Sequence, residues 1–188
     1  MDALEALTTR KSTAQLIDPA PEGQDLEKIF SAAIRVPDHG CLRPWQFVIF
    51  KDEARAELGQ IFCGALELND PNASEAAFEK ELKKPYRAPL VIVVIAKVQD
   101  HPKVPIVEQV LSAGAAAQNI MISAHALGFA GIWRTGAPCY DDFVRERLGA
   151  TGEDQIVGFL YLGTAKSFPP MPDVSIADYV MEWKAAKI

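Results

Sequence analysis

The stretch Leu90-Val91-Ile92-Val93-Val94-Ile95-Ala96 decides the fold that this sequence predicts. Seven apolar residues in a row leave no polar face, so a strand formed by them has to be buried on both sides. The chain has 188 residues, of which 49% are hydrophobic and 23% charged. This length and composition are typical of one globular unit, and we expect a single domain over residues 1–188.

Weaker patterns on both sides of this strand predict the other elements. Short strands are expected at residues 45–50, 130–134 and 155–162. Apolar spacing and turn residues predict helices at 2–10, 26–34, 53–68, 74–84, 104–127 and 140–148. The tail from Phe168 is Pro-rich and then apolar, so we expect it to dock on the chain's own core or on a partner.

Charge and cysteine usage exclude several classes of protein. The net charge of −6 argues against nucleic acid as a partner, and the three cysteines show no CxxC spacing. The N-terminus lacks the basic segment and apolar core of a signal peptide. Charged and amide side chains interrupt the apolar helix at 104–127, so no stretch reaches the ~18–20 residues of a membrane span. We therefore expect a cytoplasmic protein without membrane or nucleic-acid partners.

Common catalytic motifs are missing as well. His39 and Cys41 are two positions apart without a second pair, so no metal site is expected. No GxSxG motif is present, and no glycine follows the strand at 90–96 as dinucleotide binding of the Rossmann kind requires. If a phosphorylated cofactor binds, side chains have to hold its phosphate.

Arg10-Lys11-Ser12 is the first candidate for that task. Two cations and a hydroxyl suit a doubly charged phosphate monoester. The alternative is that Arg10 and Lys11 only complement the dipole at the C-terminal end of the first helix.

Two further segments combine features of ligand contacts. The loop at 35–45 is dense in polar groups, but its Pro37 and Pro44 could merely direct the chain into the next strand. The glycines of residues 128–136 would let a flat ring approach the backbone, although ordinary turn chemistry at both strand ends is the favoured explanation for this segment taken alone.

Taken together, these segments resemble the nitroreductase family of FMN-dependent oxidoreductases, in particular its small YdjA-like branch. The resemblance covers nearly the whole chain. Its most specific matches are Arg10-Lys11-Ser12, Arg35-Val36-Pro37-Asp38-His39, Pro44-Trp45, Arg87-Ala88-Pro89-Leu90 and Gly131-Ile132-Trp133-Arg134.

The resemblance implies an α+β fold in which helices wrap a central, mainly antiparallel sheet, and an intertwined homodimer. It also implies two FMN molecules at the subunit interface, each touched by both chains. Arg10, Lys11 and Ser12 would hold the phosphate from one subunit, and Arg35 and His39 would lie along the flavin.

Further residues follow from the same resemblance. The backbone of Gly131, Ile132 and Trp133 would approach the flavin from the partner chain, and Lys166 would be another phosphate-binding cation. NADH or NADPH would approach the stretch Met121, Ile122, Ser123, Ala124, His125 and Ala126. Many relatives carry Ser, Asn and Gln in the loop before Pro44, whereas this chain has His39, Cys41 and Arg43. His39 or backbone groups would then replace the usual amide contacts to the flavin ring.

The implied activity is reduction of nitroaromatic, quinone or similar electron-poor acceptors. NADH or NADPH would deliver hydride to flavin N5 and leave before the acceptor binds, a ping-pong scheme. Because the flavin carries the chemistry, no catalytic side chain is expected. Two alternatives remain open at this point: a flavin-binding or flavin-handling protein with little turnover, and a domain that binds another phosphorylated ligand.

Overall fold

The computed structural model describes residues 1–171 and 174–183, and it has an α+β fold built on one antiparallel sheet. β5 (Gln155–Ala165) lies at its centre. β3 (Leu90–Ala96) pairs with one side of β5, and β2 (Gln46–Lys51) pairs with β3. The short β1 (Leu16–Ile17) and β4 (Ala130–Arg134) also pair with β5.

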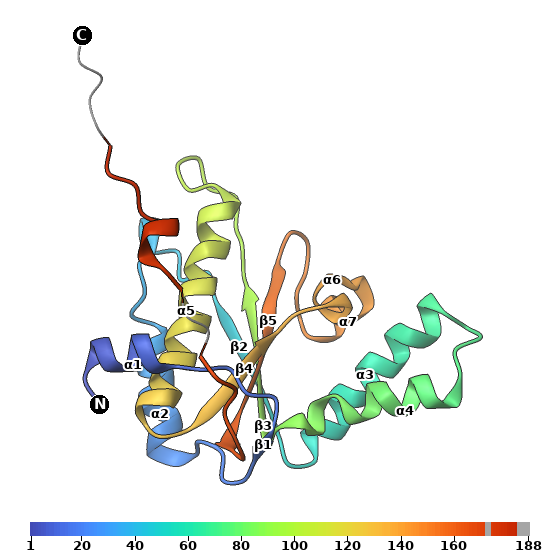
Figure 1. Ribbon diagram of the computed structural model, residues 1–188. Helices are drawn as coiled ribbons and strands as arrows, with labels where there is room; N and C mark the ends of the chain where they lie inside the picture. The colour runs from blue at the N-terminus through green and yellow to red at the C-terminus, as the bar shows by residue number, and fades with distance from the viewer. Residues whose placement is uncertain (172–173, 184–188) are drawn as a thin grey trace.

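Helices cover both faces of the sheet (Figure 1). α2 (Gly23–Ala33) and α5 (Ile106–Ala126) pack on one face, and the N-terminal α1 (Ala3–Thr9) lies against α5. On the other face lie α3 (Ala54–Asn69), α6 (Ala137–Tyr140) and α7 (Asp142–Arg147), with α4 (Glu75–Lys83) beside α3. In the described part of the chain, none of the helices has the length and apolar character needed to span a bilayer.

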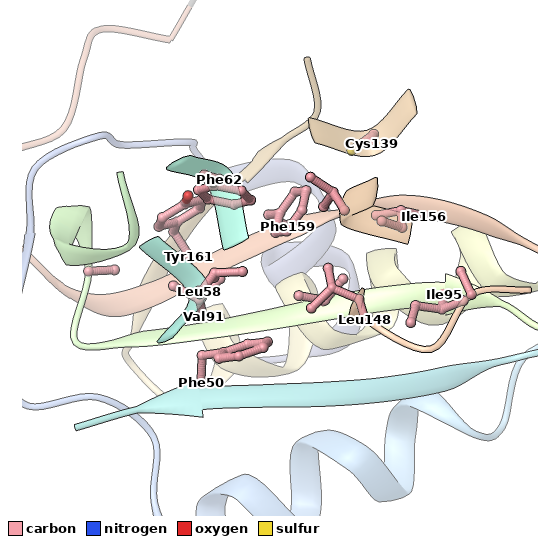
Figure 2. Packing of buried hydrophobic residues seen from close by; sticks show 14 of the residues in the cluster. Phe50, Leu58, Phe62, Val91, Ile95, Cys139, Leu148, Ile156, Phe159 and Tyr161 are labelled. Atoms are coloured by element: carbon pink, nitrogen blue, oxygen red, sulfur yellow. The ribbon is translucent and has the colours of Figure 1, made fainter. Parts of the chain in front are cut away.

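The apolar run of β3 explains this two-sided arrangement. Its side chains alternate between two hydrophobic clusters, one on each face of the sheet, and none is more than 2% exposed. Figure 2 shows the cluster on the α3 side, where Val91 and Ile95 from β3 lie with Phe159 and Tyr161 from β5. Because neither face tolerates water, both faces need a helical cover.

The predicted fold class is confirmed, with local differences. The helix expected at 140–148 is divided into α6 and α7, because Asp141 caps α7 by accepting a hydrogen bond from the Val144 N–H at 3.0 Å. The strand expected at 155–162 continues to Ala165, where it pairs with the unpredicted β1.

The apolar tail does not dock on the chain's own core within the described residues. Ile176, Tyr179 and Trp183 are 77%, 78% and 87% exposed. Of the two expectations for the tail, docking on a partner therefore stays a prediction.

The packing of Trp133 against Gly158 gives a direct test of this fold. A Cβ added at Gly158 would lie 2.1 Å from Trp133 Nε1, so we expect Gly158→Ala to destabilise the protein by about 1–3 kcal/mol. Chemical denaturation measures this loss. The double variant Gly158→Ala/Trp133→Phe should recover part of it, because the smaller ring leaves room for the Cβ. Additive effects of the two substitutions would contradict this packing.

Candidate functional site

The first group of candidate residues meets where the N-terminal segment passes β4. Ser12 and Gly131 form an isolated parallel bridge, and the Thr13 N–H donates to the Gly131 carbonyl at 3.2 Å. Arg10 Nη1 donates to Ser12 Oγ at 3.3 Å. We call this place the Ser12 corner, and it comprises Arg10, Lys11, Ser12 and Gly131.

The end of β5 brings Lys166 to the same edge of the sheet. The Lys166 N–H donates to the Gln15 carbonyl at 3.0 Å, and Thr13 Oγ1 donates to the Ser167 carbonyl at 2.9 Å. The segment that carries Lys166 therefore runs beside the segment that leaves the Ser12 corner. Sequence reasoning did not identify Thr13, the buried residue that fastens the two segments.

Two helices end at this corner. Thr9 Oγ1 at the end of α1 lies 3.0 Å from His125 Nε2 at the end of α5. Helix C-termini carry partial negative charge, so neither helix attracts an anion here. Partial burial, with a further contribution from the charge of Arg10, holds the pKa of His125 below its usual value. An anion bound at the corner is therefore attracted by the positively charged side chains and not by a helix end. The same side chains interact favourably with the negative ends of the two helix dipoles.

The polar loop before β2 has a fixed conformation. The carboxylate of Asp38 accepts hydrogen bonds from the Leu42 and Arg43 N–H groups at 3.1 and 2.8 Å. The loop passes through the left-handed region at Gly40, Cys41 and Arg43, with φ of 74°, 54° and 50°. Such backbone angles strain residues other than glycine, so the Asp38 hydrogen bonds help to hold the loop. The sequence predicted no separate role for Asp38, which was named only as part of Arg35-Val36-Pro37-Asp38-His39. Asp is nevertheless common where a side chain accepts hydrogen bonds from the backbone N–H groups of a turn.

The loop is fastened to α5. His39 Nδ1 lies 2.6 Å from Glu108 Oε2, with 56% and 44% of the two side chains exposed. Ser112 Oγ donates to the Pro37 carbonyl at 2.9 Å. Glu108, which orients His39, was missed because the two residues are far apart in the sequence and no local pattern links them.

The candidate residues fall into two groups within one chain. His39 is anchored at Glu108, whereas the Ser12 corner lies at His125, 17 positions further along α5. At 1.5 Å per residue, these two anchor points are about 25 Å apart along the helix axis. One chain therefore does not bring His39 to the Ser12 corner.

The position of Gly131 corrects one expectation. The resemblance assigned the Gly131 backbone to the partner of the chain that supplies Ser12, but the structure pairs Gly131 with Ser12 of its own chain. The reason is that β4 lies at the side of β5 next to β1, so the N-terminal segment passes directly beside it.

The other residues of β4 face both sides of the sheet. Ile132 packs on the α3 side, and Trp133 packs on the α5 side and donates from Nε1 to the Val157 carbonyl at 3.2 Å. Apart from the bridge to Ser12, the outer edge of β4 has no partner strand in the part of the chain that the structure describes. This edge offers backbone hydrogen-bonding groups to a ligand.

The stretch expected to approach the nicotinamide nucleotide is largely packed. Met121 and Ala124 are 4% and 1% exposed and belong to the core under α5. Ile122, Ser123 and His125 are half-buried, and Ala126 is exposed. Met121 and Ala124 are therefore core residues in this chain, and the other four members of the stretch present most of its surface to a nucleotide. Within residues 1–171 and 174–183, no group of His, Cys, Asp or Glu could hold a metal ion.

Comparisons with known proteins agree on one family. The model of the nitroreductase family matches residues 7–164. "Putative NAD(P)H nitroreductase YdjA" of Escherichia coli (strain K12) is 43% identical over 165 residues, which cover 87% of this chain and 88% of that protein. A relative in Haemophilus influenzae, "Putative NAD(P)H nitroreductase", is 39% identical over 165 residues, covering 87% and 89%.

Solved structures share the fold. A nitroreductase-like family protein from Bacillus cereus superposes with a TM-score of 0.83 at 22% identity, covering 98% of this chain and 97% of that one. The FMN and NADPH-dependent nitroreductase NfnB from sphigopyxis sp. strain HMH gives a TM-score of 0.74 at 19% identity, covering 98% and 100%. At these identities the likeness concerns the fold alone.

His125 reports on the charge at the Ser12 corner. Burial and Arg10 both favour its neutral form, so Arg10→Gln should raise the pKa of His125 toward the usual value of about 6.5. The pKa of His125 is lower in the folded protein than in the unfolded chain, so the folded state binds this proton less readily. The free energy of unfolding therefore decreases as the pH falls from about 6.5 through the folded-state pKa of His125. NMR titration of the imidazole resonances measures the shift.

Arg147→Gln is the control, because it removes the same charge at an exposed position on α7, and it should leave the His125 curve unchanged. An unchanged His125 curve in the folded Arg10→Gln variant would show that the Arg10 charge does not reach this corner.

Proposed function

Because the chain belongs to the nitroreductase family and is an oxidoreductase, we propose that it is an FMN-dependent enzyme that uses NADH or NADPH. Its acceptors are nitroaromatic compounds, quinones or similar electron-poor molecules, reduced in a ping-pong scheme. The supporting observation is the Ser12 corner, where two cations and a hydroxyl lie beside a free strand edge.

The residues present fit FMN. Arg10, Lys11 and Ser12 supply charged and neutral donors for a terminal phosphate, and Lys166 approaches from the next segment. The outer edge of β4 supplies N–H and C=O groups for the edge of a flat ring. A Cβ at Gly131 would lie 2.6 Å from Leu162 Cδ2 of β5, so a larger residue there would force β4 away from β5 and shift the β4 edge that meets Ser12.

The protein's own contribution is to bind and orient. FMN supplies the redox chemistry when bound, passing the two electrons of NAD(P)H to the acceptor. The Ser12 corner holds the phosphate end, and the β4 backbone fixes the ring edge. His39, held by Glu108, offers a ring nitrogen that hydrogen-bonds the flavin in place of the amides found in many relatives. Solvent supplies the protons, so no side chain acts as acid or base.

We further propose a homodimer in which each flavin is held by two chains. The ~25 Å between the anchor points of His39 and the Ser12 corner supports this arrangement, because the two groups face one flavin only if a second chain supplies one of them. The exposed apolar tail is consistent with a partner as well.

The absorption spectrum of the purified protein tests the function. We expect FMN absorption, bleaching by NADH or NADPH without oxygen, and recovery when a nitroaromatic compound is added. A protein that takes up no FMN would overturn the proposal. FMN that is bound but not bleached would instead favour the flavin-handling alternative.

Mixed dimers test the shared site. We expect Arg10→Gln to weaken FMN binding about tenfold, because a charge-assisted hydrogen bond contributes about 1.5–3 kcal/mol. We expect His39→Ala to weaken it about fivefold, because a hydrogen bond between neutral groups contributes about 0.5–1.5 kcal/mol. A dimer with one copy of each variant, isolated with two affinity tags, has one site with both changes and one with neither. Half of its sites should bind FMN with wild-type affinity.

If one chain formed the whole site, every site in the mixed dimer would carry one substitution, and no wild-type affinity would return. Lys80→Gln is the matched control, because it removes one positive charge at an exposed position on α4, away from both the Ser12 corner and the His39 loop. It should leave FMN affinity unchanged.

A further inference from the structure

A second cationic site lies on the α3 side of the sheet, away from α5. A cavity of about 400 Å³ opens between Phe62 of α3, the end of β4 and the turn that leads into α6. Figure 2 shows Phe62, Phe159 and Tyr161, three of its lining residues, grouped on this face. We call it the cationic pocket, and its charged lining residues are Lys84, Arg87 and Arg134.

The positive charge of this pocket is not balanced by its own lining, which contains no carboxylate. Lys84 pairs with Glu81 just outside it. Arg87 and Arg134 form no ion pair within the described residues, and Arg134 Nε is buried there without a hydrogen-bond partner. Leaving a buried charged donor unpaired is costly, so the arrangement indicates that an anion completes it.

Tyr161 adds a neutral donor. Its side chain is only 3% exposed and borders the pocket, and its hydroxyl forms no hydrogen bond with the described part of the chain. Burial raises the pKa of Tyr161 to about 12, although Arg87 and Arg134 oppose the shift. The hydroxyl therefore keeps its proton at neutral pH and donates it.

An apolar pocket of about 370 Å³ adjoins the cationic one and shares Phe62, Lys84, Ala137 and Pro138 with it. Leu66 and Tyr140 supply further apolar surface. Asn69, Glu81 and Asp141 supply polar groups at its margin, where Asn69 Nδ2 donates to Asp141 Oδ2 at 2.7 Å. Each volume is in the range of small-ligand sites. The pair of pockets thus presents an anion site next to a place for a flat, partly polar ring.

We propose that these two pockets bind the adenosine 2′-phosphate end of NADPH, with the phosphate on Arg87, Arg134 and Tyr161 and the adenine against Tyr140 and Leu66 of the apolar pocket. Two unpaired guanidinium groups suit a doubly charged phosphate better than they suit a singly charged carboxylate. Arginine also forms bidentate hydrogen bonds with phosphate oxygens. The identification of the nucleotide rests on the proposed function. In the proposed site, the adenosine end lies on the opposite face of the sheet from Met121–Ala126. Because the site binds the 2′-phosphate, the enzyme prefers NADPH to NADH.

Binding of nucleotide fragments to the purified protein tests this site without any turnover. By titration calorimetry, 2′,5′-ADP should bind at least about tenfold more tightly than 5′-ADP, which lacks the 2′-phosphate. Arg134→Gln and Arg87→Gln should each weaken 2′,5′-ADP binding about tenfold, and Tyr161→Phe less. Arg134→Lys, which keeps the charge, should restore part of the affinity.

Arg147→Gln is the matched control, since Arg147 is exposed on α7 and lines neither pocket. It should leave the affinity unchanged. Arg134→Gln should not lower the melting temperature, because it removes a buried donor without a partner. In turnover, its KM for NADPH should rise while its KM for NADH stays the same.

Equal binding of 5′-ADP and 2′,5′-ADP, or unaltered 2′,5′-ADP binding in both arginine variants, would overturn the inference. An FMN enzyme with either result would leave the proposed function intact. Specific 2′,5′-ADP binding by a protein without FMN would instead support the site and remove the proposed activity.

Discussion

The burial of β3 on both faces is the constraint on which the structure depends. A strand without a polar side needs a strand on each edge and helices on each face, and β2, β5, α5 and α3 meet these needs. The two helical layers differ in their polar residues. The layer with α1, α2 and α5 adjoins the Ser12 corner and the His39 loop, whereas the layer with α3 and α6 borders the cationic pocket. The sheet thereby separates two sets of cations that would repel each other if they were adjacent.

β4 connects the two layers. Its short length and outer position leave one edge free for a ligand, and its alternation directs neighbouring side chains to opposite faces. Gly131 meets Ser12, Trp133 packs under α5, and Arg134 reaches the cationic pocket. A displacement of β4 would therefore disturb both candidate sites, which gives the close contacts at Gly131 and Gly158 a functional consequence as well as a structural one.

The sequence predicts most elements because their signals are local. β3 is a continuous apolar run, and the pattern of α5 persists over many turns, so both were expected within two residues of their observed ends. Contacts between distant segments leave no such signal. The pairing of Ser12 with Gly131 in one chain, the contact of His39 with Glu108 and the meeting of Arg87 with Arg134 all depend on how the elements pack. Family resemblance named several of these residues, but only the fold shows which of them lie together.

The separation within α5 bears on the relation between assembly and activity. Because His39 and the Ser12 corner are fixed to opposite ends of one rigid helix, bending the chain does not bring them together. A flavin that uses both groups has to lie across two chains, and its binding energy then favours the dimer. Neither α1 nor α5 offers a positive helix end at the corner, so the few cations there provide the attraction in a chain whose net charge is −6. If the chain binds FMN in this proposed arrangement, loss of one such cation would weaken cofactor binding and, through it, the assembly.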